Sequence, residues 1–215
     1  MAAPSLAAMP LLIKLNFFRA PVPTESIGIN FAYYAFLGAL VGSIARPFGG
    51  WMADKWGGAK VTFWTFVAMI VGTLTVIYTL TQLTPVPKPP PGAPAPDPAT
   101  FEYKPEVVAA VNANSDIFPW FLLAFLFVFA ASGIGNGSTF RTIGVIFDRT
   151  QAGPVLGWTS AIAAYGAFIA PVVIGAQIKA GTPQFAMYGF AVFYALCLIL
   201  NWWFYLRPNA YVKNP

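Results

Sequence analysis

Length, composition and charge set this chain apart from water-soluble proteins. It has 215 residues, of which 58% are hydrophobic and only 9% are charged, whereas soluble domains carry about 25% charged residues. One water-soluble core cannot hide so much apolar surface, and several apolar runs reach the roughly 20 residues that a helix needs to cross a bilayer. The runs are continuous rather than alternating, which disfavours a β-barrel. We therefore predict an all-α integral membrane protein that resides in a lipid bilayer.

The same composition excludes several functions. The net charge is +5, but the basic residues are scattered singly and form no polybasic tract that could hold nucleic acid. The chain has no histidine, which rules out a histidine-based catalytic or metal site. Without a cluster of Asp, Glu or Cys we expect neither an enzyme nor a cofactor. The single cysteine, Cys197, excludes an internal disulfide, and we interpret it as a small core residue.

Six apolar stretches follow one another along the chain. The first, at residues 1–13, is interrupted by Pro4 and Pro10, is too short to span a bilayer, and lacks the basic residues that precede the apolar part of a signal peptide. We predict that each of the other five forms a transmembrane helix. Their expected limits are 26–53, 61–83, 117–147, 156–178 and 185–206.

Residues 84–116 separate the second predicted helix from the third. They include the run PVPKPPPGAPAPDP, whose composition favours extended, polyproline-type chain over helix. We predict a solvated external loop that acts as a spacer. Counting Lys and Arg in the connections gives five on each side of the membrane, so the positive-inside rule does not orient the chain.

Arg46 is the most informative residue of the first predicted helix. Seven apolar or small residues separate it from Asp54 and Lys55, which places it about 12 Å inside that boundary if the helix continues. An arginine at such depth faces a cavity or a partner, and its planar fork of donors suits a small planar oxyanion. The alternative is that the helix ends at Arg46 and residues 47–53 form a turn outside the membrane.

Polar side chains also interrupt the 117–147 segment. Arg141 precedes Asp148 by seven residues, so the depth argument applies to it again. Gly133 and Gly137 form a G-x-x-x-G surface, whose simpler interpretation is tight helix packing. Asn136, Ser138, Thr139 and Arg141 lie well inside apolar flanks, and Phe140 shares a helix face with Asn136. From this stretch we select Asn136, Ser138 and Arg141 as candidate substrate-binding residues.

Small residues dominate the fourth segment, LGWTSAIAAYGAFIAPVVIGAQI, which also contains Pro171. Small faces allow helices to slide and proline can localise a bend, so this helix is a candidate gate, although plain packing explains the pattern equally well. All seven acidic residues lie at segment ends or in loops. We therefore expect no carboxylate to pair with Arg46 or Arg141 inside the membrane, and we infer an anionic guest.

Three blocks of sequence resemble one family. Gly50, Asp54, Lys55 and Gly57 in GWMADKWGGAK match the loop motif of the major facilitator superfamily. The longer stretch ARPFGGWMADKWGGAKVTFWTF is similar to the junction of helices eight and nine in NarK-type nitrate/nitrite porters. GIGNGSTFRTIGVIF resembles their tenth helix, and SAIAAYGAFIAP resembles the nitrate signature of their eleventh.

The resemblance implies a partial C-terminal half of a major facilitator fold, from the end of helix seven, in PLLIKLNF, through helix twelve. It implies nitrate or nitrite transport by alternating access in the cell (inner) membrane, with Arg46 binding the anion. Asp54 would stabilise one conformation, and residues of the eleventh helix would line the path: Ala164, Gly166, Ala167 and Phe168. Complete members have about twelve helices in two halves, so an N-terminal half-transporter is the expected partner.

A second hypothesis retains the membrane fold but assigns the chain no transport activity. In it, the chain is a truncated fragment or an accessory subunit that packs against another membrane protein. We expect exposed small-residue faces at Gly38 with Gly42 and at Gly133 with Gly137 to serve such packing.

Overall fold

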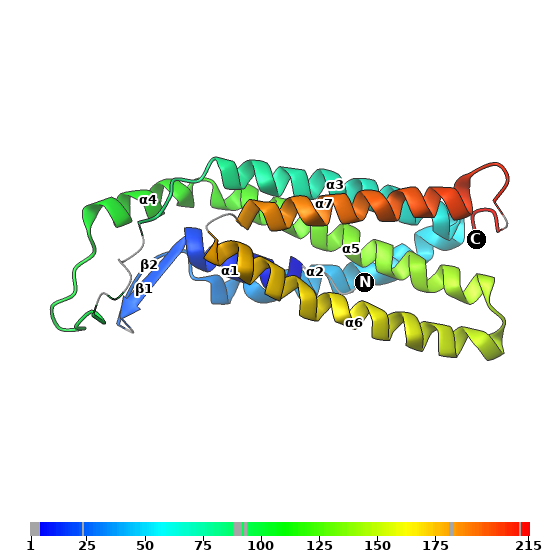
Figure 1. The fold of residues 1–215 in the computed structure, drawn as a ribbon, viewed down its shortest axis with the longest axis horizontal. Helices are drawn as coiled ribbons and strands as arrows, with labels where there is room; N and C mark the ends of the chain where they lie inside the picture. Colours follow the sequence, from blue (N-terminus) through cyan, green and yellow to red (C-terminus); the bar gives the residue numbers. More distant parts are fainter. Residues whose placement is uncertain (1–4, 23, 88–91, 93, 181–182, 211) are drawn as a thin grey trace.

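The computed structural model describes residues 5–22, 24–87, 92, 94–180, 183–210 and 212–215 (Figure 1). Within these residues five helices are long and apolar enough to cross a membrane: Phe31–Trp56, Gly58–Thr81, Phe118–Ile146, Arg149–Gln177 and Gln184–Leu206. Each overlaps one of the five predicted segments, so the predicted number and order of the spans are confirmed. The all-α membrane fold is confirmed as well, with one small sheet added.

The amino-terminal part forms a short helix and a hairpin. Helix α1 covers Ser5–Asn16, and strands β1 (Phe18–Val22) and β2 (Glu25–Gly28) pair antiparallel. The prediction that the first transmembrane helix begins near residue 26 was wrong, because residues 25–28 hydrogen-bond to β1 instead. A 3₁₀ turn at Phe31–Tyr33 leads into the helix.

A single residue separates the first two long helices. Helix α2 spans Ala35–Trp56 and α3 spans Gly58–Thr81. Gly57 lies between them with φ of +88°, in the left-handed region that glycine adopts without strain. Its N–H bonds to the carbonyl of Ala53 at 2.9 Å. The α2–α3 turn is therefore tight, and the two helices run back alongside α5 from it.

The proline-rich connection is not extended throughout. Helix α4 forms at Pro105–Ser115, which corrects the prediction of a loop without helix. Pro105 occupies the first turn, where the missing N–H costs nothing. The buried side chain of Asn114 donates to the carbonyls of Asn16 (2.8 Å) and Thr84 (3.0 Å) and fixes this end of the connection. The prolines at 89–91, with Lys88 and Ala93, lie outside the described residues.

The remaining helices complete the bundle. Helix α5 covers Phe118–Ile146, α6 covers Arg149–Lys179 and α7 covers Pro183–Asn201, which continues as a π-helical turn at Trp202–Leu206. Figure 1 shows α3 and α7 side by side along one edge of the bundle, α6 along the opposite edge and α5 between them. Helix α5 is therefore the central element.

The core is aromatic at the end of the bundle near α1. Phe17 and Phe121 are fully buried with ring centroids 5.0 Å apart, and Phe125 follows at 4.9 Å from Phe121. In the most apolar 18-residue stretch of α5, 56% of the residues are buried. In the corresponding stretches of α2 and α6, only 11% and 12% of the residues are buried. Helices α2 and α6 therefore present most of their apolar surface outward, to lipid or to further protein.

Candidate anion site

Arg46 lies inside a continuous helix. Helix α2 runs through Pro47 without a break and ends ten residues after Arg46, at Trp56, which is about 15 Å along the axis. The alternative that the helix ends at Arg46 was therefore wrong. Proline removes one backbone bond but does not stop this helix, because the close packing of α2 on α5 holds both sides of it.

Glycines bring α2 and α5 into backbone contact. A side chain at Gly133 would meet the backbone of Gly42, and one at Gly137 would meet the carbonyl oxygen of Arg46. The packing interpretation of the G-x-x-x-G pair is confirmed. The expectation that these faces, and that of Gly38, are exposed for a partner was wrong, because Gly38 packs on the ring of Phe129 within the same chain.

The contact with Gly137 fixes the backbone from which the Arg46 side chain extends. The Arg46 backbone is held against α5, while its side chain is exposed. Among the described residues no carboxylate forms an ion pair with it. An exposed, carboxylate-free guanidinium near the middle of a membrane-length helix can bind an anion with two parallel N–H bonds.

Arg141 has a different environment. Its Nε donates to Oδ1 of Asp54 at 2.8 Å, which joins the end of α5 to the end of α2. This corrects the expectation that no carboxylate pairs with Arg141. The sequence missed the pair because its members are 87 residues apart and meet only when α2 packs on α5. The two arginines are therefore distinct, since one is paired and the other is not.

The other candidates on α5 divide between two surfaces. Ser138 is fully buried, donates to the carbonyl of Gly135 (3.0 Å) and lies 2.8 Å from the hydroxyl of Thr62 on α3. It therefore lies in the α3–α5 interface and not beside the exposed Arg46. Asn136 is also buried, and Phe140 is 38% exposed. Helical geometry places both about 60–100° around α5 from Gly137, on the side away from α3.

The candidates on α6 lie on exposed parts of that helix. Phe168 is 72% exposed, and the Gly166 position meets no neighbouring atom within 4 Å. Ala164 is exposed, and the side chain of Ala167 lies outside the described residues. The helix continues through Pro171. Their predicted place along an anion path stays a prediction.

The loop-motif residues surround the α2–α3 turn, where the carboxyl-terminal tail also lies. The amide of Asn214 donates to the carbonyl of Trp56 (3.0 Å) and accepts from the N–H of Lys60 (3.1 Å). The carbonyl of Pro215 accepts from the N–H of Gly58 at 2.5 Å. A Cβ atom at Gly50 would point into open space, and Lys55 lies over the ring of Trp51. The sequence offered no signal for the tail, because its partners are more than 150 residues away.

Comparisons with known proteins bear directly on the recognised family. No protein-family model matches the chain. The "Probable nitrate/nitrite antiporter NarK2" of Thermus thermophilus is 36% identical over 209 residues, which is 95% of this chain and 38% of that protein. The "Nitrate/nitrite transporter NarU" of Escherichia coli K12 and that of Salmonella typhimurium are each 30% identical over 212 residues, covering 88% of this chain and 39% of those proteins.

These relatives confirm the resemblance to nitrate/nitrite porters, which are transporters and not enzymes. The chain spans about two fifths of the length of the curated relatives that it matches. That partial coverage is consistent with the predicted placement in the C-terminal half of a major facilitator fold.

Proposed function

We propose that this chain, a homologue of nitrate/nitrite transporters, is the C-terminal part of a transporter that moves nitrate or nitrite by alternating access. Arg46 is the anion ligand in this proposal. The observation that carries it is the contrast between the two arginines of the α2–α5 pair. Arg141 is neutralised by Asp54, while Arg46 is exposed in mid-helix and has no carboxylate partner among the described residues.

The free-energy cost of placing a charge within a membrane supports this assignment. An unpaired arginine at the centre of a membrane costs about 3 kcal/mol or more, so it persists where a cavity or counter-charge accompanies it. The guanidinium is a planar fork that presents two parallel N–H donors. Nitrate and nitrite are planar oxyanions whose adjacent oxygens fit that fork.

The site needs a second surface. Helices α2 and α6 leave most of their apolar residues exposed, and transporters with internal repeats bind substrate where two repeats meet. We infer that an N-terminal half-transporter covers this face, in the cell (inner) membrane, and completes the cavity in front of Arg46. Phe168, Gly166 and Asn136 remain candidate lining residues of that cavity. The homology to transporters favours this function over the accessory-subunit alternative.

The Asp54–Arg141 pair supplies a conformational role. It joins the ends of α2 and α5 at one end of the bundle, and both side chains are partly open to solvent, at 66% and 26% exposure. We infer that this contact favours one state of the alternating-access cycle. A pair with this exposure contributes roughly 0.2–1 kcal/mol, which is enough to shift a two-state equilibrium up to about fivefold.

The proposal is tested on the protein that its natural gene encodes, in cells that lack nitrate transport. Arg46→Lys keeps the charge and removes the fork, so nitrate uptake should fall at least about tenfold at equal protein level. Arg149→Lys is the matched control, because Arg149 is exposed at the start of α6, and its uptake should be unchanged. Full uptake by Arg46→Lys would overturn the assignment of the anion ligand.

A further inference from the structure

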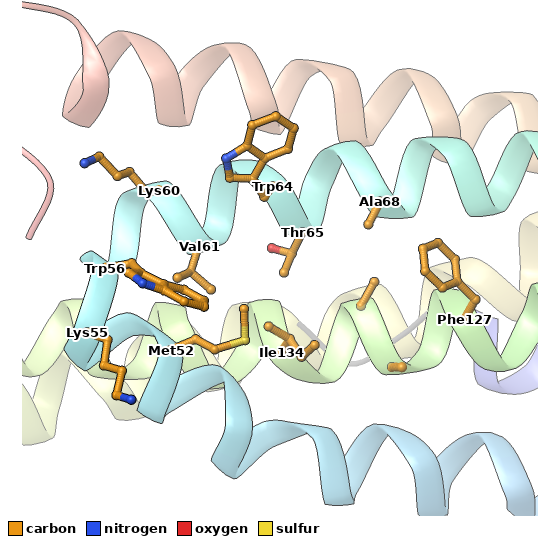
Figure 2. A pocket seen from close by; sticks show the side chains of 12 residues that line it. Met52, Lys55, Trp56, Lys60, Val61, Trp64, Thr65, Ala68, Phe127 and Ile134 are labelled. Carbon is orange, nitrogen blue, oxygen red and sulfur yellow. The ribbon is translucent and has the colours of Figure 1, made fainter.

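A groove opens between α2, α3 and α5. It encloses a cavity of about 680 Å³, which is within the size range of small-molecule sites. Figure 2 shows Lys55 and Lys60 at the end of the groove where α2 turns into α3, and Phe127 toward the other end. The groove therefore has a basic end and an apolar remainder.

This groove is separate from the candidate anion site. Met52 lines it from α2, and Met52 lies six residues after Arg46, which places the two side chains about 120° apart around the helix. The buried residues Ala45 and Gly49 face α5 between those two directions. An occupant of the groove therefore does not contact the guanidinium of Arg46.

The basic end carries uncompensated positive charge. Lys55 and Lys60 are both exposed, and none of the described lining residues is acidic. The neighbouring carboxylate of Asp54 is already engaged by Arg141 at 2.8 Å. The ammonium of Lys55 lies 4.1 Å from the ring centroid of Trp51 instead. Within the part of the chain that the structure describes, neither lysine has a carboxylate partner. Two such lysines at the mouth of one groove complement an anionic group.

The rest of the groove suits hydrocarbon. Its floor includes Val61, Ala68, Ala130 and Ile134, and Ala68 lies eight residues beyond Lys60, about 12 Å along α3. Trp56 and Trp64, which are 55% and 67% exposed, flank the basic end. Tryptophan is enriched at the level of lipid headgroups. The groove thus passes from charged to aromatic to apolar in the same order as a bilayer leaflet.

We propose that this groove binds an anionic phospholipid. The phosphate lies at the basic end of the groove, which carries Lys55 and Lys60, and one acyl chain follows the floor toward Phe127. Basic pockets between transmembrane helices bind anionic headgroups in this way. A protein segment would match the apolar floor but would not account for the two lysines. The lipid would contact both helices that meet at the α2–α3 turn, independently of whether the protein transports nitrate.

The test titrates the purified protein, as its natural gene encodes it, with phosphatidylglycerol and with phosphatidylcholine of identical acyl chains. Native mass spectrometry measures the bound lipid. Phosphatidylglycerol should bind more tightly, and Lys55→Gln with Lys60→Gln should weaken it about 25-fold, since each lysine near a headgroup contributes about fivefold. Lys213→Gln, an exposed lysine near the same turn that does not line the groove, should leave binding unchanged.

A photoreactive phosphatidylglycerol locates the site. Cross-links should map to residues 60–68 and 127–134, and Ala130→Phe, which fills the floor without changing charge, should remove them. Equal binding of the two lipids, or a Lys55→Gln and Lys60→Gln protein that binds phosphatidylglycerol as before, would overturn the proposal. Absence of cross-links at 127–134 would also overturn it, because the acyl chain would then not lie on this floor.

Discussion

Gly137 of α5 lies directly against the carbonyl oxygen of Arg46 on α2, with no room between them for a Cβ atom. This contact sets the distance between the two helices at the level of the proposed anion ligand. It also means that the position of the guanidinium depends on a residue that does not touch the anion.

Gly137→Ala should therefore impair both stability and transport. The added methyl group meets backbone rather than a flexible side chain, so α2 must move, at a cost of about 1–3 kcal/mol. Thermal unfolding in detergent and nitrate uptake at equal protein level measure the two effects. Gly144→Ala on the same helix adds the methyl group into open space and serves as the control. Identical behaviour of the two variants would show that the helices are not held this closely.

The Asp54–Arg141 pair should show a small, salt-sensitive coupling. We expect a double-mutant cycle of Asp54→Asn and Arg141→Gln to yield a coupling free energy of about 0.2–1 kcal/mol from unfolding measurements. The value should decrease at high ionic strength, because both side chains are open to solvent. Strictly additive effects of the two substitutions would argue against the pair in the folded protein.

Ser138 should prove structural rather than anion-binding. Removing its buried hydroxyl in Ser138→Ala takes a hydrogen-bond partner from Thr62, which should destabilise the protein by about 1–3 kcal/mol. Thr62→Val in the same protein should recover part of the loss, because both polar groups are then gone. The KM for nitrate should stay at its original value in both variants. A large increase in that KM would restore Ser138 to the anion site.

Tyr103 should fix the β1–β2 hairpin to the connection between α3 and α5. Its hydroxyl lies 3.0 Å from the carbonyls of Arg19 and of Glu25. Tyr103→Phe should lose about 1 kcal/mol of local stability, measured as faster hydrogen exchange in residues 18–28. Tyr33→Phe, at a ring that is 72% exposed, is the control.

The same contact should depend on pH in the alkaline range. Burial, together with the Glu25 carboxylate, raises the pKa of Tyr103 above its ordinary value of 10.0. A raised tyrosine pKa means that the folded state keeps its proton where the unfolded chain loses it, so the stabilisation is complete below about pH 10 and is lost as the pH rises further. Hydrogen exchange in residues 18–28 should therefore accelerate above pH 10 in the original protein, and less so in Tyr103→Phe.

The apolar runs predicted the spans because a bilayer imposes length and composition on every crossing helix. Counting residues to Asp54 also favoured a helix that continues past Arg46, and α2 does continue to Trp56. Contacts between distant segments were not readable. Asp54 meets Arg141, and Asn214 meets the α2–α3 turn, only after the helices have packed. Helix α4 was missed because the neighbouring prolines dominate the composition, although Pro105 can start a helix.

Pro47 gives α2 a mechanical property that α3 and α5, the two long helices packed against it, lack in their interiors. Proline has no N–H, so the carbonyl of Ser43 receives no bond from position 47, and the helix is least stiff at the residue beside Arg46. Below this point Asp54 anchors the helix to Arg141, and above it Gly38 rests on Phe129. Arg46 thus lies between two segments of α2 that are each fixed to α5. A small change in the angle between these segments changes the direction of the Arg46 side chain.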